Sequence, residues 1–393
     1  MKKIVAAGLL LAPFTLAFAQ SSVSLYGIVD AAIRRTDNEG PAGAVDMSKT
    51  QMIGGGMSQS RWGINVTEDM GNGLKAIANL ENRFTPDDGA QGVGQPLFSQ
   101  SWVGLQSSSF GRITAGRQYN VLFDLVTSTY ASFPYSPYME AYKPEIGMAA
   151  GARNNNMLKY TAEFGAIRGS LQYSVDEGNT VDKMGAAAAA AGAFKSVGGY
   201  LRYSNQGISG GAGYLRTTLP GGTKLDAWTL GSSYRSGPLY LNLGYAVNER
   251  KGGAYALNTA SIVDSNVIAA FWTGASNGGF LPGSPATGPT NILNLRDHAN
   301  KREMLKIGFG YQVTPQINLG AHYFNAKQSG SASGVYNGRA HFYVAAADYA
   351  FSKRTDAYFA VDRTRVNGGS GMMLSSNGAR TRTGITVGLR HRF

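Results

Sequence analysis

The chain has 393 residues, contains no cysteine and carries a formal net charge of +12 at neutral pH. Charged residues make up 15% of it and glycine 53 of the 393 residues, whereas soluble domains average about 25% charged residues and about 7% glycine. The lack of cysteine excludes a disulfide framework and a thiolate metal site, and the composition disfavours an ordinary soluble domain.

Residues 1–19 have the three parts of an export signal. Lys2 and Lys3 form the positive start, residues 4–18 form an apolar run, and Ala17-Phe18-Ala19 is a small-residue cleavage site. Pro13 and the short apolar run argue against a retained transmembrane helix. We therefore expect a signal peptide at 1–19 and a mature chain at 20–393 that forms one domain. Removal of the two lysines lowers the net charge from +12 to +10.

Alternating apolar and polar residues predict β-strands along the mature chain. Side chains on a strand point to opposite faces with a period of two, so each alternating segment has one apolar face. Such segments recur at 23–34, 61–67, 74–83, 167–174, 239–245, 305–312 and 316–323. The chain ends on another, with Ile385, Val387, Leu389 and Phe393 on one face and glycine, threonine and arginine on the other.

The connections between these segments alternate between short turns and long polar stretches. Short turns occur at 69–72, 108–111, 314–315 and 352–354. Long stretches occur at 37–59, 85–100, 119–151, 176–195, 251–302, 328–338 and 367–379. Short connections at one rim and long ones at the other are typical of an all-β transmembrane antiparallel β-barrel, here with about sixteen strands. A soluble β-sandwich also alternates, but the export signal and this asymmetry favour the barrel.

Several segments resemble the general, non-specific porins of Gram-negative bacteria, of the trimeric type found in β-proteobacteria. The resemblance spans the mature chain and rests on the segments SVSLYG (22–27), SRWGI (60–64), EDMGNGLKA (68–76), WVGL (102–105), FGRITAGRQ (110–118), SKRT (352–355) and GLRHRF (388–393).

Membership of that family implies a sixteen-stranded homotrimer in the cell outer membrane, with a water-filled pore for small hydrophilic solutes and ions. It also implies a third long loop folded into the pore as a constriction, and a terminal Phe393 that signals to the outer-membrane assembly machinery. The first, second and sixth long loops have sequences of their own, so the resemblance implies no substrate preference.

The polar faces of the strands provide a candidate pore wall. Sixteen strands enclose an aqueous channel, whose selectivity depends on its radius and wall charges. A cation facing lipid near the midplane costs about 2–4 kcal/mol, so the cations on these faces are expected to point inward. The expected basic wall of the constriction is Arg34, Arg61, Lys75, Arg83, Arg168 and Arg382, and acids of the same parity, such as Asp30, Glu81 and Glu163, are fewer.

The candidate constriction loop is 119–151, with the acidic residues Asp124, Glu140 and Glu145. In the family that the chain resembles, acids of this loop face arginines on the wall. Opposed charges would set a transverse field across the narrowest section. The excess of cations favours a weak preference for anions.

Other functions have weaker support in the sequence. The four histidines are scattered, and no nucleophile–histidine–acid motif or metal-ligand spacing is found, so we expect no enzyme, metal or cofactor. The cations are spread rather than clustered, which disfavours nucleic acid and makes outer-membrane lipid and lipopolysaccharide better partners. An adhesin with working loops and a substrate-specific channel remain alternatives.

Overall fold

The computed structural model describes residues 21–40, 47–91, 97–131, 152–175, 195–218, 224–251, 300–331, 333–335, 337–374 and 377–393. Nearly all of them belong to β-strands or to the turns between strands, and the described part contains one helix, α1 (Val121–Thr129). None of the described helical residues form a helix long and apolar enough to cross a membrane. The expected signal peptide, 1–19, lies outside the described residues.

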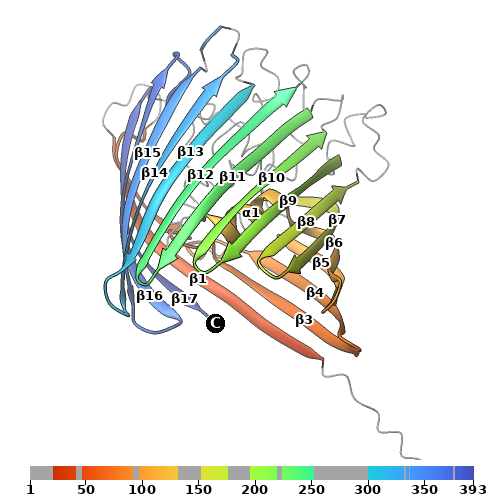
Figure 1. Cartoon of the computed structure of the whole chain (residues 1–393). Coiled ribbons are helices and arrows are strands. Elements are labelled where there is room, and N and C mark those ends of the chain that lie inside the picture. The colour runs from red at the N-terminus through yellow and green to blue at the C-terminus, as the bar shows by residue number, and fades with distance from the viewer. Residues whose placement is uncertain are drawn as a thin grey trace, which may run out of the picture.

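Seventeen antiparallel strands form one sheet that curves into a barrel (Figure 1). They are β1 (Ser22–Thr36), β2 (Lys49–Gly54), β3 (Arg61–Gly71), β4 (Leu74–Arg83), β5 (Gln100–Ser107), β6 (Gly111–Tyr119), β7 (Arg153–Phe164), β8 (Ile167–Ser174), β9 (Lys195–Asn205), β10 (Ile208–Thr218), β11 (Lys224–Ser236), β12 (Leu239–Lys251), β13 (Lys301–Gln312), β14 (Ile317–Ser329), β15 (Gly338–Ala350), β16 (Thr355–Gly368) and β17 (Thr381–Arg392).

The sheet closes at β1. One edge of β1 pairs with β17, and the other pairs first with β3 and then with β2. Because β2 and β3 share one position beside β1, the seventeen strands fill sixteen positions, which confirms the expected barrel. The sequence pattern contained no indication of β2, which lies within the stretch 37–59 that we expected to be a connection.

Along the strands, apolar side chains face outward and polar side chains face the lumen, as the alternation predicts. On β17, Ile385, Val387 and Leu389 are exposed on the outer face, whereas Arg382 and Arg390 are buried on the inner face. The exposed apolar side chains provide the surface that a bilayer would cover.

The final residue joins the seam of the barrel. Phe393 and Gly27 exchange two backbone hydrogen bonds, with N–O distances of 3.0 and 3.1 Å. The ring of Phe393 lies over Gly27, where an added Cβ would be only 2.2 Å from it. Gly27 therefore leaves room on the outer face for the terminal aromatic ring.

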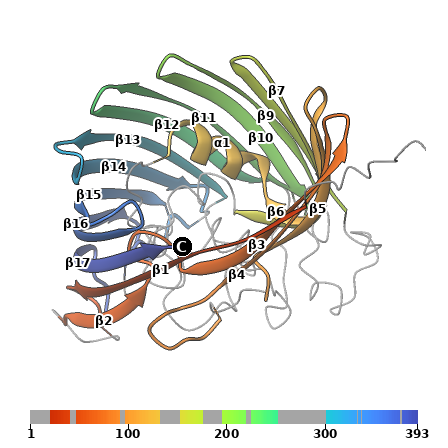
Figure 2. The same cartoon turned by 90° about the horizontal axis from the view of Figure 1, so that it is seen from below.

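Helix α1 lies inside the barrel against the inner face of β9 to β11 (Figure 2). Asn120 caps its first turn, because its side-chain oxygen accepts a hydrogen bond from the N–H of Phe123 at 2.9 Å. Glycines of the wall allow close packing: an added Cβ on Gly213 would lie 2.9 Å from Leu122, and one on Gly231 would lie 2.4 Å from the ring of Tyr130. The helix begins the expected constriction loop, so part of that loop lies in the lumen.

Candidate pore constriction

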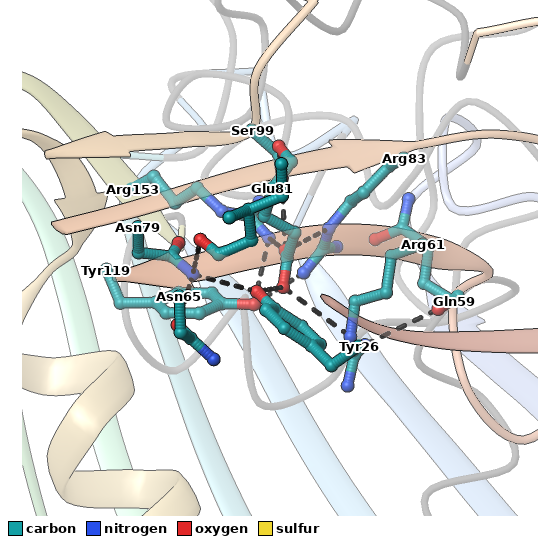
Figure 3. Close-up of polar contacts among 11 residues, drawn as sticks. Tyr26, Gln59, Arg61, Asn65, Asn79, Glu81, Arg83, Ser99, Tyr119 and Arg153 are labelled. Atoms are coloured by element: carbon teal, nitrogen blue, oxygen red, sulfur yellow. Dashed lines mark hydrogen bonds and ion pairs between the residues drawn. The ribbon is translucent and has the colours of Figure 1, made fainter. Parts of the chain in front are cut away.

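A cluster of arginines surrounds one carboxylate at the long-loop end of β3, β4, β6 and β7 (Figure 3). Glu81 Oε1 lies 3.2 Å from Nε of Arg83 and 3.8 Å from Nη2 of Arg153, and Oε2 lies 3.5 Å from Nε of Arg61. The hydroxyl of Ser99 donates to Oε1 at 3.0 Å. We call Arg61, Glu81, Arg83 and Arg153 the arginine cluster. Its formal charge is +2, from three arginines and one glutamate.

Strand register explains why these side chains meet. Arg61 and Arg83 are directly paired on β3 and β4, and Glu81 lies two residues before Arg83 on the same face. Tyr119 and Arg153 are paired where β6 ends and β7 begins. The cluster therefore combines the loop-side ends of β3 and β4 with the first residue of β7, which follows the connection 120–152.

Tyr119 connects this cluster to α1. Its hydroxyl oxygen accepts hydrogen bonds from Arg83 at 2.5 Å and from Arg153 at 2.9 Å. The guanidinium of Arg153 lies 4.4 Å from the centre of the Tyr119 ring, and that ring stacks on Phe123 of the helix with centroids 4.4 Å apart. The wall charges and the helix are thus held in one contact network.

Further polar contacts extend the network along the wall. The hydroxyl of Tyr26 donates to Glu81 Oε2 at 3.2 Å and accepts from the amide of Asn79 at 3.0 Å. Asn79 also donates to Asn65 at 2.8 Å. Nearby on β6, the buried Arg117 donates to the side-chain oxygen of Asn155. The lumen face here is strongly polar and carries more cations than acids.

Among the expected loop acids, Asp124 lies in α1 and is paired with a wall cation. Its Oδ2 is 2.6 Å from Nζ of Lys159, which also donates to the backbone oxygen of Tyr119 at 2.7 Å. The N–H of Val121 donates to the side-chain oxygen of Gln172 at 2.7 Å. Asp124 therefore contacts β7 rather than the arginine cluster. Glu140 and Glu145 lie outside the described residues.

The six expected wall residues are divided among three places. Arg61 and Arg83 belong to the arginine cluster. Arg34 and Arg382 are buried on β1 and β17, where Arg34 binds Asp362 at 2.7 Å and the hydroxyl of Thr386 at 2.8 Å. Lys75 and Arg168 lie at the short-turn end, where Lys75 is exposed and Arg168 pairs with Glu163 at 2.6 Å. The structure does not bring all six together.

Two central residues were missed by sequence reasoning. Tyr119 was assigned to the expected constriction loop, 119–151. Arg153 was not singled out because it lies directly after that loop. Arg117 has the parity of Ile113, which is exposed on the outer face, so alternation alone did not indicate it; β6 is irregular between Gly116 and Gln118. Among the described residues, no group of three or more His, Asp or Glu side chains could hold a metal ion.

A closed barrel with an apolar outer face, a charged lumen and a helix inside defines an outer-membrane channel of the porin class. Comparison with known families agrees, because residues 5–369 match the model of the Gram-negative porins. The chain belongs to this family, which confirms the resemblance seen in its sequence. The family and the fold are those of outer-membrane channel proteins.

Individual relatives support the same assignment. The chain is 34% identical over 249 residues to outer membrane porin protein 32 of Delftia acidovorans, which covers 60% of this chain and 67% of that protein. It is 28% identical over 372 residues to an outer membrane porin protein of Bordetella pertussis, covering 83% of this chain and 94% of that protein. An anion-selective porin from Comamonas acidovorans has a similar structure, with a TM-score of 0.67 at 24% identity over 95% of this chain and all of that one.

Proposed function

We propose that the channel passes small hydrophilic solutes and ions by passive diffusion, with a weak preference for anions. The arginine cluster carries this proposal, because three arginines face the lumen around one glutamate beside a helix that lies inside the barrel. A lumen lined by cations lowers the energy of an anion and raises that of a cation.

The placement of acids supports the same sign of selectivity. Asp124 and Asp362 are paired with Lys159 and Arg34, so neither adds an unbalanced negative charge to the wall. The structurally similar Comamonas porin is itself described as anion-selective. The basic wall that we propose consists of Arg61 and Arg83, with Arg153 added. Lys75 and Arg382 lie in more distant parts of the lumen, and Arg34 and Arg168 are paired with Asp362 and Glu163.

A planar-bilayer experiment tests this function. The reversal potential in a potassium chloride gradient is expected to indicate anion preference, which should be stronger at low ionic strength because screening is weaker. Glu81→Gln should increase the preference, since it leaves the cluster with more positive charge. Glu163→Gln is the matched control: its carboxylate is about half-exposed beside a short turn, and it should have a smaller effect. Cation preference of the unmodified channel, or no current, would contradict the proposal.

We also propose that the protein forms a homotrimer and has no enzymatic activity. An outer membrane protein of Vibrio cholerae with a similar fold is described in a trimer form. Phe393, which pairs with Gly27 at the seam, is proposed as the signal for the outer-membrane assembly machinery. Exposed cations at the long-loop rim are proposed to contact lipopolysaccharide. Migration of the unboiled protein as a trimer, with dissociation on heating, tests the oligomeric state.

A further inference from the structure

The wall of the barrel is interrupted between β2 and β3, where residues 55–60 turn into the lumen. Strand β2 is paired with β1 as far as Ala31, and β3 is paired with it from Ile28, so only two residues of β1 lie opposite these six. An added Cβ on Gly56 would collide with the hydroxyl of Tyr358, which is on the inner face of β16. The six residues therefore lie on the inner wall, and we call them the inward segment.

The buried carboxylate of Asp30 holds the middle of the inward segment. Its Oδ2 accepts hydrogen bonds from the N–H of Met57 at 3.0 Å and from that of Ser58 at 2.6 Å. Its Oδ1 accepts one from the hydroxyl of Tyr358 at 2.5 Å. Asp30 has the inward parity of β1, and the structure uses it to bind this segment while the segment covers it.

Both ends of the inward segment are also attached to the wall. The carbonyl oxygen of Asp30 accepts a hydrogen bond from the N–H of Gly55 at 2.8 Å, and the N–H of Asp30 donates to the hydroxyl of Ser60 at 2.9 Å. Between these ends, the hydroxyl of Ser58 accepts from Arg390 of β17 at 2.7 Å. The segment is thus fixed to the barrel at several points.

The ring of Tyr358 lies beneath the inward segment. Tyr358 is on β16 and its partner Asp30 is on β1, so the side chain must cross β17. Gly388 of β17 is paired with Tyr358, and an added Cβ there would collide with the ring. The glycine therefore leaves the space through which the hydroxyl reaches Asp30.

The inward segment and α1 narrow the lumen from opposite sides. In the ring of sixteen strand positions, β10 is the eighth position from β1 in either direction. Helix α1 packs against β9 to β11, and Figure 2 shows it across the lumen from β1 and β2. Val126 and Tyr130 at the end of the helix and Met57 of the inward segment belong to one buried apolar cluster, with inner-face side chains such as Phe324 and Phe342.

The arginine cluster lies on the other side of the lumen between these two inserts. Arg61 directly follows the inward segment, and its Nη1 donates to the backbone oxygen of Gln59 at 3.4 Å (Figure 3). The side chain of Arg61 is 28% exposed, whereas Phe324 and Phe342 on the apolar side are at most 2% exposed. The part of the described lumen that solutes can reach is therefore the basic side.

We propose that the inward segment is a second constriction element of the pore, fixed opposite α1, and that Asp30 and Tyr358 are its positioning residues. This inference rests on the proposed diffusion of solutes through the lumen. The segment sets the width of the passage and the position of Arg61, so that solutes pass close to the arginine cluster.

Labelling of a single cysteine tests whether the segment lines the passage, because the chain contains no cysteine of its own. Gln59→Cys is treated in a planar bilayer with 2-sulfonatoethyl methanethiosulfonate, and mass spectrometry confirms the labelling. The added sulfonate should lower the single-channel conductance about twofold or more and reduce anion preference, because selectivity depends on pore radius and wall charge. Ser109→Cys, in an exposed short turn, is the matched control and should conduct normally when labelled.

Variants of the positioning residues test how the segment is held. Tyr358→Phe keeps the ring and removes the hydroxyl bound to Asp30, so we expect a larger conductance, entry of larger neutral polyethylene glycols and weaker anion preference. Asp30→Ala should produce the same changes to a greater extent. Tyr349→Phe, at an exposed tyrosine of the outer face, is the control and should match wild type.

Several outcomes would overturn the constriction. They are a Gln59→Cys that does not react, one that reacts without changing the current, and a Tyr358→Phe that only lowers thermal stability while conductance and reversal potential stay as in wild type. If Asp30→Ala does not fold, the labelling result and Tyr358→Phe still decide. A wild-type barrel that conducts nothing contradicts the proposed channel and the constriction with it, whereas conducting barrels that are insensitive to labelling contradict the constriction alone.

Discussion

The carboxylate of Asp124 lies 2.6 Å from the ammonium group of Lys159, which joins α1 to strand β7 inside the barrel. The Lys159 side chain is almost fully buried, and its ammonium group also donates to the backbone oxygen of Tyr119. The residue at which the connection leaves β6 and the helix that follows are therefore both held by one lysine.

Asp124→Asn and Lys159→Met should each loosen the helix. Hydrogen bonds to charged groups contribute about 1.5–3 kcal/mol, and the lysine is left without its carboxylate partner in the first variant. We expect lower thermal stability and larger fluctuations of the open-channel current. In a double-mutant cycle the two changes should be strongly non-additive, because they remove the same contact. Additive effects would show that the pair does not hold the helix.

The glycines beneath α1 provide a second test. Gly231→Ala would place a methyl group 2.4 Å from the ring of Tyr130, so the end of the helix must move. Overpacking of this kind typically costs about 1–3 kcal/mol, and we expect an altered single-channel conductance as well as lower stability. Gly210→Ala is the matched control, since its added Cβ would meet its nearest neighbour at 3.8 Å, an ordinary contact. If both variants behave like wild type, α1 does not depend on this close packing.

The alternation of side chains predicted the barrel well, because a period of two is visible in a single strand and does not depend on its neighbours. It failed where tertiary packing determines the structure. The segment of α1 is rich in valine and threonine, which favour strands, and it forms a helix where Leu122 and Leu125 pack against Gly211 and Gly213. Strand β2 is short and ends at Gly54, and it is defined mainly by its pairing with β1.

The arginine cluster was only half predictable for a related reason. Parity alone places Arg61 and Arg83 in the lumen. The position of Arg153 depends on the point at which β7 begins after the long connection 120–152. No local sequence pattern predicts that point. Arg153 can be placed beside Tyr119 only when the register of β6 and β7 is known, because the two residues are paired across these strands.

Deletion of Phe393 should reduce the amount of folded barrel in the outer membrane severalfold. It removes two backbone hydrogen bonds to Gly27, each contributing about 1 kcal/mol, together with the ring that covers this glycine. The conductance of the barrels that do assemble should be nearly unchanged, because the residue lies outside the lumen. Phe351→Ala, at an exposed aromatic residue of a short turn, is the control and should assemble normally. Equal losses in both variants would remove any special role of the terminal residue.

Charge reversal within the arginine cluster should change ion selectivity far more than charge reversal on the outer face. Arg61→Glu or Arg83→Glu is expected to move the reversal potential towards cation preference, because these side chains face the lumen beside α1. Lys251→Glu should do little, since Lys251 points outward at the end of β12 and pairs with Asp226 at 3.0 Å.

Distance and screening explain this difference. Wall charges act over the Debye length, about 10 Å at 0.1 M salt and about 3 Å at 1 M, so an ion in a narrow section passes within reach of Arg61 and Arg83. The shifts should accordingly shrink when the same gradient is applied at higher total salt. Reversal potentials measured for all three variants at two ionic strengths provide the comparison. Equal shifts from the three substitutions would mean that the arginine cluster does not form the selective section of the pore.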